Sequence, residues 1–251
     1  MSDFLQTTHL IIILCFLQQF LCTRMDIVIW LTCTTVPLSR RGRIGLGGSV
    51  ILHVSDIHCS LRRLEDIISS LPVKPSTVAA TGDFECEKAA VAIVEWSRRE
   101  GVPLVAVTGN LDHAGVRRVL RSAGVLMDGR VDRVGGLVFG GVGGMDPRTS
   151  MEMLLRSLES SGLTVDVLLT HHPPHGVLDT TFAGVRAGLH DLRSLVDSLK
   201  PRAHLFGHIH ESPGIESIGG TVFVNPGPAY EGRYALVRIL GSVVKAELYT
   251  A

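Results

Sequence analysis

Gly207-His208-Ile209-His210 directly follows a short apolar run at residues 203–206. On a strand or a tight loop, side chains two residues apart point the same way, so both imidazoles can reach one target. Neutral imidazole is a common ligand of transition metals, and two converging rings can form part of a metal site. The alternative is a histidine pair on a solvated loop. Partners elsewhere in the chain decide between the two interpretations.

From residue 49 onward, short apolar runs alternate with amphipathic segments. The pattern predicts strands at residues 50–54, 77–80, 103–107, 131–134, 137–142, 165–169, 203–206, 215–218, 221–224, 234–240 and 243–248. It predicts helices at residues 61–71, 85–100, 114–123, 150–160 and 189–199, with Ser150 as a candidate N-cap. Gly135-Gly136 indicates a hairpin. This order favours an α/β core with a second sheet packed on it, in one domain spanning residues 49–251.

Polar residues follow several of these predicted strands at the point where each strand ends. They are Asp56 and His58, Asp83, Asn110 and Asp112, His171 and His172, and His208 and His210. Each has an ordinary structural explanation, such as a helix cap for Asp83, a turn for Asn110 or a satisfied core histidine for His171. However, the carboxyl ends of strands in α/β sheets meet at one edge, where ligands bind. The shared position therefore favours one common site.

Five blocks of the chain also share a family's order and spacing. They are Asp56-Ile57-His58, Gly82-Asp83, Gly109-Asn110-x-Asp112, His171 and Gly207-His208-x-His210. In this order they resemble the signature of calcineurin-like metallophosphoesterases, over roughly residues 50–230, and Asn225-Pro226-Gly227 is similar to a turn of the smaller members. The resemblance implies a small, cap-less, phosphodiesterase-like protein. Its implied fold is a four-layer α/β/β/α sandwich of two mixed sheets with flanking helices.

The resemblance also implies a ligand set for two divalent metal ions. Asp56, His58 and His210 would bind the first ion, Asn110, His171 and His208 the second, and Asp83 both. His171 is favoured over His172, because the family's ligand precedes the residue before Pro-Pro. Asp112 is expected behind the ligands, orienting a loop or a histidine. Oxygen and imidazole donors suit Mn²⁺, our preferred ion, with Fe, Zn²⁺ or Ni²⁺ as alternatives.

Two such ions, about 3.5–4 Å apart, can clamp phosphate oxygens and generate a bridging hydroxide from water. We therefore expect a metal-dependent hydrolase of a small phosphate ester, with Asp83 and Asn110 as catalytic residues. A phosphodiester is preferred over a monoester because no cap domain is apparent. A phosphomonoesterase and a non-catalytic scaffold of the same fold remain alternatives.

The chain departs from the commonest family pattern at Leu111. Many members carry a histidine there that protonates the leaving group, and an aliphatic side chain cannot donate a proton. Water, a good leaving group or His113 would have to replace it, so His113 is our candidate acid. The departure predicts slow turnover or a restricted range of substrates.

The composition indicates which classes of partner and which cellular compartment to expect. The net charge is zero and aromatic residues make up 5%, which gives no basic field or stacking platform for nucleic acid. The cysteines, at positions 15, 22, 33, 59 and 86, form no CxxC pair and predict reduced thiols in a cytoplasmic protein. We expect a small buried filler role for Cys59. A homo-oligomer is compatible with the sequence.

Residues 1–48 differ from the rest and are predicted to be an extension outside the folded domain, or the result of a start codon upstream of Met25. The apolar segment at residues 10–22 is interrupted by Gln18 and Gln19, and it is shorter than the roughly 20 residues of a spanning helix. No basic n-region or cleavage site marks a signal peptide. A membrane anchor at residues 10–22 is the less favoured alternative.

Overall fold

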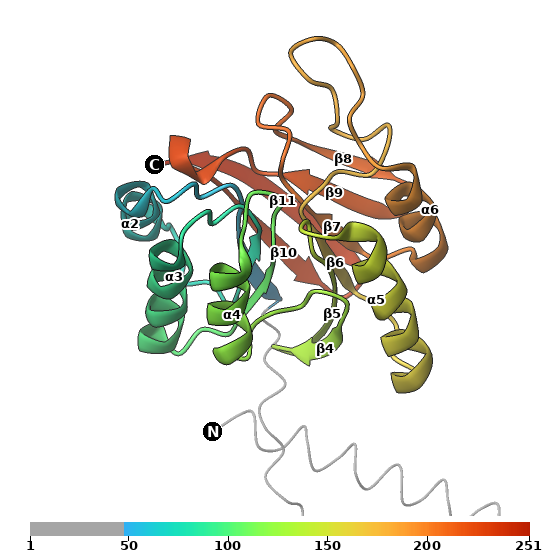
Figure 1. Cartoon of the computed structure of the whole chain (residues 1–251), viewed down its shortest axis with the longest axis horizontal. Coiled ribbons are helices and arrows are strands. Elements are labelled where there is room, and N and C mark those ends of the chain that lie inside the picture. Colours follow the sequence, from blue (N-terminus) through green and yellow to red (C-terminus); the bar gives the residue numbers. More distant parts are fainter. Residues whose placement is uncertain (1–47) are drawn as a thin grey trace, which may run out of the picture. The chain divides into compact units, whose positions relative to one another are not determined.

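The computed structural model describes residues 48–251, so the expectations for residues 1–47, including the segment 10–22, lie outside the described part. Two mixed β-sheets form the centre of the described fold (Figure 1). Within residues 48–251, no helix combines the length and the apolar character needed to cross a membrane.

The first sheet contains five strands in the order β11-β10-β1-β2-β3. Their bounds are Ser49–Val54 for β1, Thr77–Thr81 for β2, Leu104–Val107 for β3, Arg233–Leu240 for β10 and Val243–Thr250 for β11. β1, β2 and β3 are parallel, whereas β10 pairs antiparallel with both β1 and β11. The C-terminal strands therefore complete the sheet that the first strands begin.

The second sheet contains six strands in the order β4-β5-β6-β7-β9-β8. Their bounds are Val131–Val134 for β4, Leu137–Val142 for β5, Val167–Thr170 for β6, Ala203–Leu205 for β7, Gly214–Ile218 for β8 and Thr221–Asn225 for β9. The inner four strands are parallel, and β4 and β8 are antiparallel edges. The predicted β4–β5 hairpin is confirmed.

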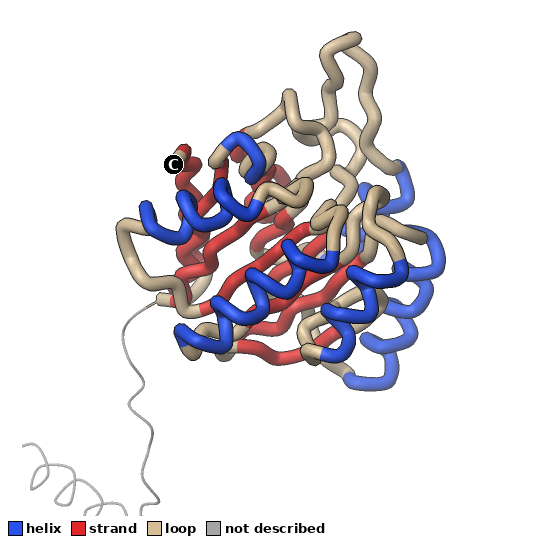
Figure 2. The backbone as a smooth tube through the Cα atoms, turned by 60° about the vertical axis from the view of Figure 1, so that its left-hand side comes forward, coloured by secondary structure: helices blue, strands red, loops and turns tan. Residues whose placement is uncertain are grey.

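Helices cover the outer faces of both sheets (Figure 2). They are α2 (Leu61–Ser70), α3 (Glu87–Glu100), α4 (Ala114–Ser122), α5 (Pro147–Ser161), α6 (His190–Leu199) and the short 3-10 helix η1 (Ala229–Glu231). Residues of α2, α3 and α4 pack with outward-facing residues of the first sheet, and residues of α5 and α6 pack with the second.

A third apolar layer lies between the sheets. Ile51 of β1 faces it while its neighbour Leu52 faces the helices, as the two-residue period of a strand requires. Phe139 of β5 is fully buried in the same layer. The predicted four-layer α/β/β/α arrangement of two mixed sheets is therefore confirmed.

Two expectations from the sequence are wrong. The helix predicted from Ser150 begins at Pro147, and the carboxylate of Asp146 caps it by accepting a hydrogen bond from Thr149 N at 3.1 Å. Proline is tolerated at the first helical position because its missing N–H would have no partner there. Ser150 lies inside the helix, where its Oγ accepts a hydrogen bond from Gly143 N at 2.9 Å.

The second correction concerns the cysteines. Cys59 and Cys86 form a disulfide across 27 residues of sequence, so the expectation of reduced thiols is wrong for this pair. Cys59 is also exposed, contrary to the expected buried role. The parallel pairing of β1 and β2 places the loops that follow them side by side, which brings the two Cα atoms to 5.5 Å. Spacing along the chain does not reveal that proximity.

Phe139→Ala tests the layer between the sheets. Removing this fully buried ring leaves a cavity, so we expect the free energy of unfolding to fall by about 3–5 kcal/mol in urea titrations. Phe182→Ala is the matched control, because Phe182 is 92% exposed and its loss should change stability by less than about 0.5 kcal/mol. Similar losses in the two variants would contradict the assigned core.

Candidate metal centre

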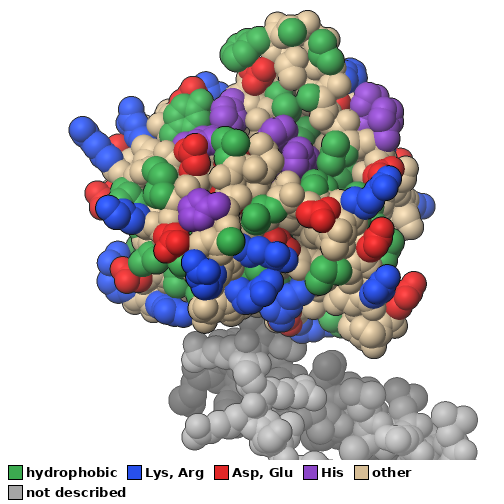
Figure 3. Space-filling model, viewed as in Figure 1, with side chains coloured by type: hydrophobic (Ala, Val, Ile, Leu, Met, Phe, Trp, Pro, Cys, Tyr) green, Lys and Arg blue, Asp and Glu red, His purple; other side chains and the backbone are tan. Residues whose placement is uncertain are grey.

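The polar strand ends meet at one edge of the described fold. β1, β2 and β3 lead to Asp56 and His58, to Asp83 and to Asn110, while β6 and β7 lead to His171 and to His208 and His210. Six of these residues form two groups, Asp56 with His58 and His210, and Asp83 with His171 and His208. Within each group the ligand-type atoms all lie within 4.8 Å of one another. Figure 3 shows histidine side chains gathered on the upper part of one face.

The first group joins the ends of β1 and β7. The Nε2 atom of His210 lies 3.3 Å from Asp56 Oδ1 and 3.4 Å from Nε2 of His58. Asp56 is almost fully buried, whereas the two histidines are partly exposed. One carboxylate and two imidazoles therefore converge where solvent and a ligand can enter.

The second group joins β2 and β6 with the loop after β7. The Nε2 atom of His171 lies 3.4 Å from Asp83 Oδ2 and 2.8 Å from Oδ1 of Asn110. The His171 and His208 ring centroids are 5.0 Å apart. The structure thus brings together every ligand-type residue that the sequence singled out at this edge.

Outer partners hold the rings of three of these histidines, His58, His171 and His210, by their Nδ1 atoms. Nδ1 of His171 lies 2.8 Å from the carbonyl oxygen of Thr81, so Nδ1 carries the proton and donates it. For His58 the Nδ1 partner is Glu85 Oε2 at 3.3 Å, and for His210 it is the Tyr230 hydroxyl at 3.2 Å. An outer contact at Nδ1 fixes the orientation of a ring and leaves Nε2 to face the centre, as in metal-binding histidines.

Several of these residues have a left-handed backbone. The φ angle is 55° at Asp56, 46° at His58, 51° at Asp83 and 70° at His208. Non-glycine residues rarely adopt this region, and they cluster in it at functional sites where surrounding contacts hold the strain. The strain is therefore a second, backbone-level indication that this edge is a site.

Burial and opposite charges compete at the centre. Burial would raise the pKa of Asp56, but contacts with His210 and His171 lower it to about 2. Burial would likewise lower the pKa of His171, yet Asp83 and Asp56 raise it to about 9. Burial, together with the charge on His171, lowers the pKa of His208 to about 4. The two carboxylates thus stabilise positive charge on His171, while His208 is left as a neutral imidazole.

The donor set fits divalent cations. Asp56 Oδ1 is buried and makes no hydrogen bond, although His210 Nε2 is near it, which is how a carboxylate oxygen reserved for a metal would appear. Carboxylate, amide and imidazole donors without a thiolate suit ions such as Mn²⁺. Each group offers its donors to one common point, so the residues could hold two ions.

Asp112 and His113 lie behind or beside the two groups. Asp112 accepts hydrogen bonds from Glu85 N and Gly109 N, both at 2.8 Å, and so connects the loops after β2 and β3. Asp112 was expected to orient either a loop or a histidine, and these contacts to backbone N–H groups support the orientation of a loop. His113 is exposed and caps α4, since its Nδ1 accepts a hydrogen bond from Gly115 N at 3.0 Å. His113 belongs to neither group.

His172 also borders the centre. Its ring centroid lies 4.5 Å from that of His208, and burial together with neighbouring histidines lowers its pKa to about 3. His172 therefore lines the site as a neutral ring. Leu111, where a histidine acid is common in the family, is half-exposed, and its N–H donates to Asp83 Oδ1 at 2.9 Å.

Sequence reasoning missed the residues that support the histidines from outside. Neither Glu85 nor Tyr230 lies in a recognisable motif. The sequence places Asn225 only in a turn, yet its Nδ2 donates to the carbonyl oxygens of Ile209 and Ser212, at 2.9 and 3.0 Å. Asn225 thereby holds the loop that carries His210, and the Asn-Pro-Gly motif was the signal that could have identified it.

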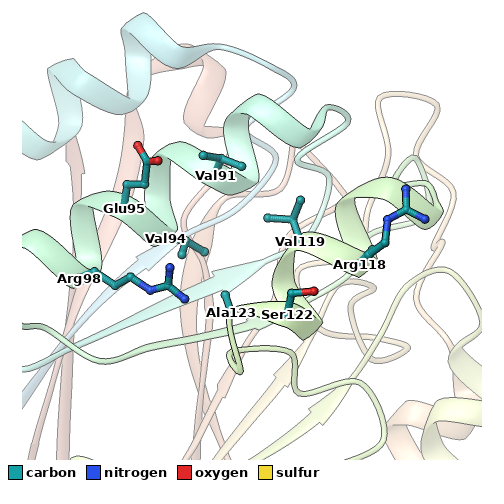
Figure 4. A pocket seen from close by; sticks show the side chains of 8 residues that line it. All are labelled: Val91, Val94, Glu95, Arg98, Arg118, Val119, Ser122 and Ala123. Atoms are coloured by element: carbon teal, nitrogen blue, oxygen red, sulfur yellow. The ribbon is translucent and has the colours of Figure 1, made fainter.

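A separate hollow of about 320 Å³ lies between α3 and α4. Figure 4 shows Val94, Val119 and Ala123 along it, with Arg98 beside them. It contains no histidine and no residue from the strand ends. The hollow is therefore distinct from the candidate metal centre.

Comparison with known proteins identifies the family of this chain. Residues 50–242 match the model of the calcineurin-like phosphoesterase superfamily domain. Human metallophosphoesterase domain-containing protein 1 is 28% identical over 195 residues, which cover 71% of this chain and 59% of that protein. A UPF0046 protein of Caenorhabditis elegans is 36% identical over 91 residues, 36% of this chain and 31% of that protein. The matched parts are thus less than two thirds of either relative.

Solved structures show the same fold. The crystal structure of TT1561 of Thermus thermophilus superposes with a TM-score of 0.63 at 16% identity, covering 80% of this chain and 98% of that one. At this identity the likeness concerns the fold alone, whereas the domain match covers most of the chain. The chain belongs to the calcineurin-like phosphoesterase superfamily.

Proposed function

We propose that this protein hydrolyses phosphate esters, phosphodiesters in preference to monoesters, with two divalent ions and Mn²⁺ as the working metal. The observation that carries the proposal is the pair of adjoining groups, Asp56 with His58 and His210, and Asp83 with His171 and His208. Their donor atoms face inward at the strand edge, and Asp56 Oδ1 is buried without a hydrogen bond.

In this proposal Asp56, His58 and His210 hold the first ion, and Asn110, His171 and His208 hold the second. Asp83 contacts both, and two features support this role. Its Oδ2 faces His171 at 3.4 Å, while its Oδ1 is fixed by the N–H of Leu111 at 2.9 Å. The backbone N–H of Asp56 also donates to the carbonyl oxygen of Gly82 at 3.1 Å, and Gly82 directly precedes Asp83.

When bound, a pair of divalent ions supplies acidified water and takes up negative charge on phosphate oxygens. The chain itself contributes orientation. Thr81, Glu85 and Tyr230 fix the histidine rings, and the rigid strand ends fix the carboxylates. No side chain at position 111 can protonate a departing alcohol, so the proposal favours esters whose alcohol leaves easily.

Asp83→Asn tests the assignment. Replacing a carboxylate that serves both ions removes one negative charge from the centre, so hydrolysis of bis(p-nitrophenyl) phosphate with Mn²⁺ should fall by at least about 100-fold. Asp132→Asn, a change at an exposed carboxylate on β4, is the control and should leave the rate unchanged. Activity that survives both Asp83→Asn and chelation would refute a metal-dependent reaction, and wild-type protein that binds metal without turnover would favour the scaffold.

His208→Ala and His210→Ala separate the two ions. Each variant removes one ligand from a different group, so metal analysis should show the loss of about one ion per chain in each. The affinity for the remaining ion should differ between the variants. His208→Ala leaves the group that contains Asp56 intact, whereas His210→Ala leaves the group that contains His171 intact. Two bound ions in both variants would show that neither histidine is a ligand.

Leu111→His tests the missing acid. A histidine beside Asp83 could protonate a departing alcohol, so turnover of a methyl phosphodiester with a poor leaving group should rise by about 10-fold or more. Hydrolysis of the p-nitrophenyl ester, whose leaving group needs no proton, should change little. Leu111→Gln is the matched control for polarity at this position. An equal rise with both esters would argue against an acid role.

A further inference from the structure

The Cys59–Cys86 disulfide joins the loop after β1 to the loop after β2 at the edge of the first metal group. Cys59 directly follows His58, and Cys86 directly follows Glu85, whose Oε2 contacts His58 Nδ1 at 3.3 Å. The disulfide therefore joins the residue next to His58 to the residue next to Glu85, whose carboxylate orients the His58 ring. No other residue pair among those described makes such a covalent link between the two loops.

We propose that Cys59 and Cys86 form a thiol–disulfide exchange site, and that a dithiol reductant acting there loosens His58 and weakens ion binding by the first group. The exchange itself is independent of the proposed hydrolysis. Its consequence for ion binding rests on the proposed function, because it takes His58 as a ligand.

The backbone on both sides of the bridge explains why the link matters. His58 and Cys59 have φ angles of 46° and 57°, and Glu85 has 66°. These left-handed conformations persist only where surrounding contacts hold them. Two backbone hydrogen bonds do so, from His58 N to Asp83 O at 2.9 Å and from Cys59 N to Phe84 O at 3.1 Å. Without the bridge, only non-covalent contacts, these two bonds and the His58 Nδ1–Glu85 Oε2 contact among them, would join the strained segments.

Access favours attack at one sulfur. Cys59 is exposed and Cys86 is half-buried, so a reductant reaches Cys59 more easily. A thiolate of the dithiol bonds to Cys59 Sγ as the Cys59–Cys86 bond breaks, and the released Cys86 thiolate takes up a proton. The second thiol of the reductant then displaces Cys59, which is protonated in turn. Two electrons and two protons pass to the protein, and the reductant becomes a cyclic disulfide.

The histidines of the second group are anchored differently. His171 is fully buried and held by the Thr81 carbonyl at 2.8 Å, and His208 N donates to Asp56 Oδ2 at 3.1 Å. Neither contact passes through the bridge. Reduction should therefore act on the group that contains His58 more than on the group that contains His171.

The first measurement is Mn²⁺ binding by equilibrium dialysis on the full chain, oxidised or treated with dithiothreitol. Mn²⁺ is the probe because thiolates bind it poorly, whereas freed thiols would capture Zn²⁺. We expect one of two Mn²⁺ affinities to fall by about 10-fold or more on reduction, as when an outer support of a ligand is lost.

The double variant Cys59→Ser with Cys86→Ser is the control, and it should show the weakened affinity and no response to dithiothreitol. Differential alkylation with peptide mapping identifies the exchanging cysteines.

The second measurement does not depend on metal. Amide hydrogen exchange at His58 and Cys59 should accelerate on reduction, since their N–H groups hold the strained loop. The amide of Phe206, which follows β7 and donates to the carbonyl oxygen of Val224, should not change. If no Mn²⁺ binds in either state, the proposed function fails, and amide exchange still decides whether the bridge controls the loop. Equal amide exchange in both states, or a pair that alkylation finds permanently reduced in air, would overturn the inference.

Discussion

The buried carboxylates of Asp56 and Asp83 need nearby positive charge to compensate their own, and the architecture of the centre depends on that requirement. Asp56 and Asp83 are only 1% and 2% exposed, and the charge of Asp56 acts on Asp83 as a like charge. A buried unpaired charge is far more costly than a paired one. The imidazoles of His171 and His210 are the nearest groups that can supply the compensation, and divalent ions would supply more. The centre is therefore built to attract cations.

Close approach of the loops follows from the same requirement. A Cβ at Gly109 would collide with the carboxylate of Asp83, and one at Gly207 would collide with Ser55 and Asp56. Only glycine lets these loops come near enough to the carboxylates for the next residues, Asn110 and His208, to reach the centre. The glycines before the polar residues thus serve the geometry of the centre directly.

Most of the centre could be predicted because its ligand-type residues follow predicted strands, and strand order in an α/β fold carries their ends to one edge. The prediction extended to the two sheets, the hairpin and the helices within a few residues. It missed contacts between segments that the sequence does not relate. Glu85 reaches His58 and Cys86 reaches Cys59 across 27 residues each, and no local pattern marks either pair. The start of α5 at Pro147, with Asp146 as its N-cap, was not predicted because the buried Ser150 resembles a cap in the sequence.

The outer contacts explain how the strained residues of the candidate metal centre stay in position without a bound ion. Asp112 ties the loops after β2 and β3 through two backbone N–H groups, and Asn225 holds the loop of His210 through two carbonyls. Both side chains are buried, so their hydrogen bonds compete little with water. The order of these loops thus comes from the protein itself, and free energy from an arriving ion is available for binding rather than for folding the site.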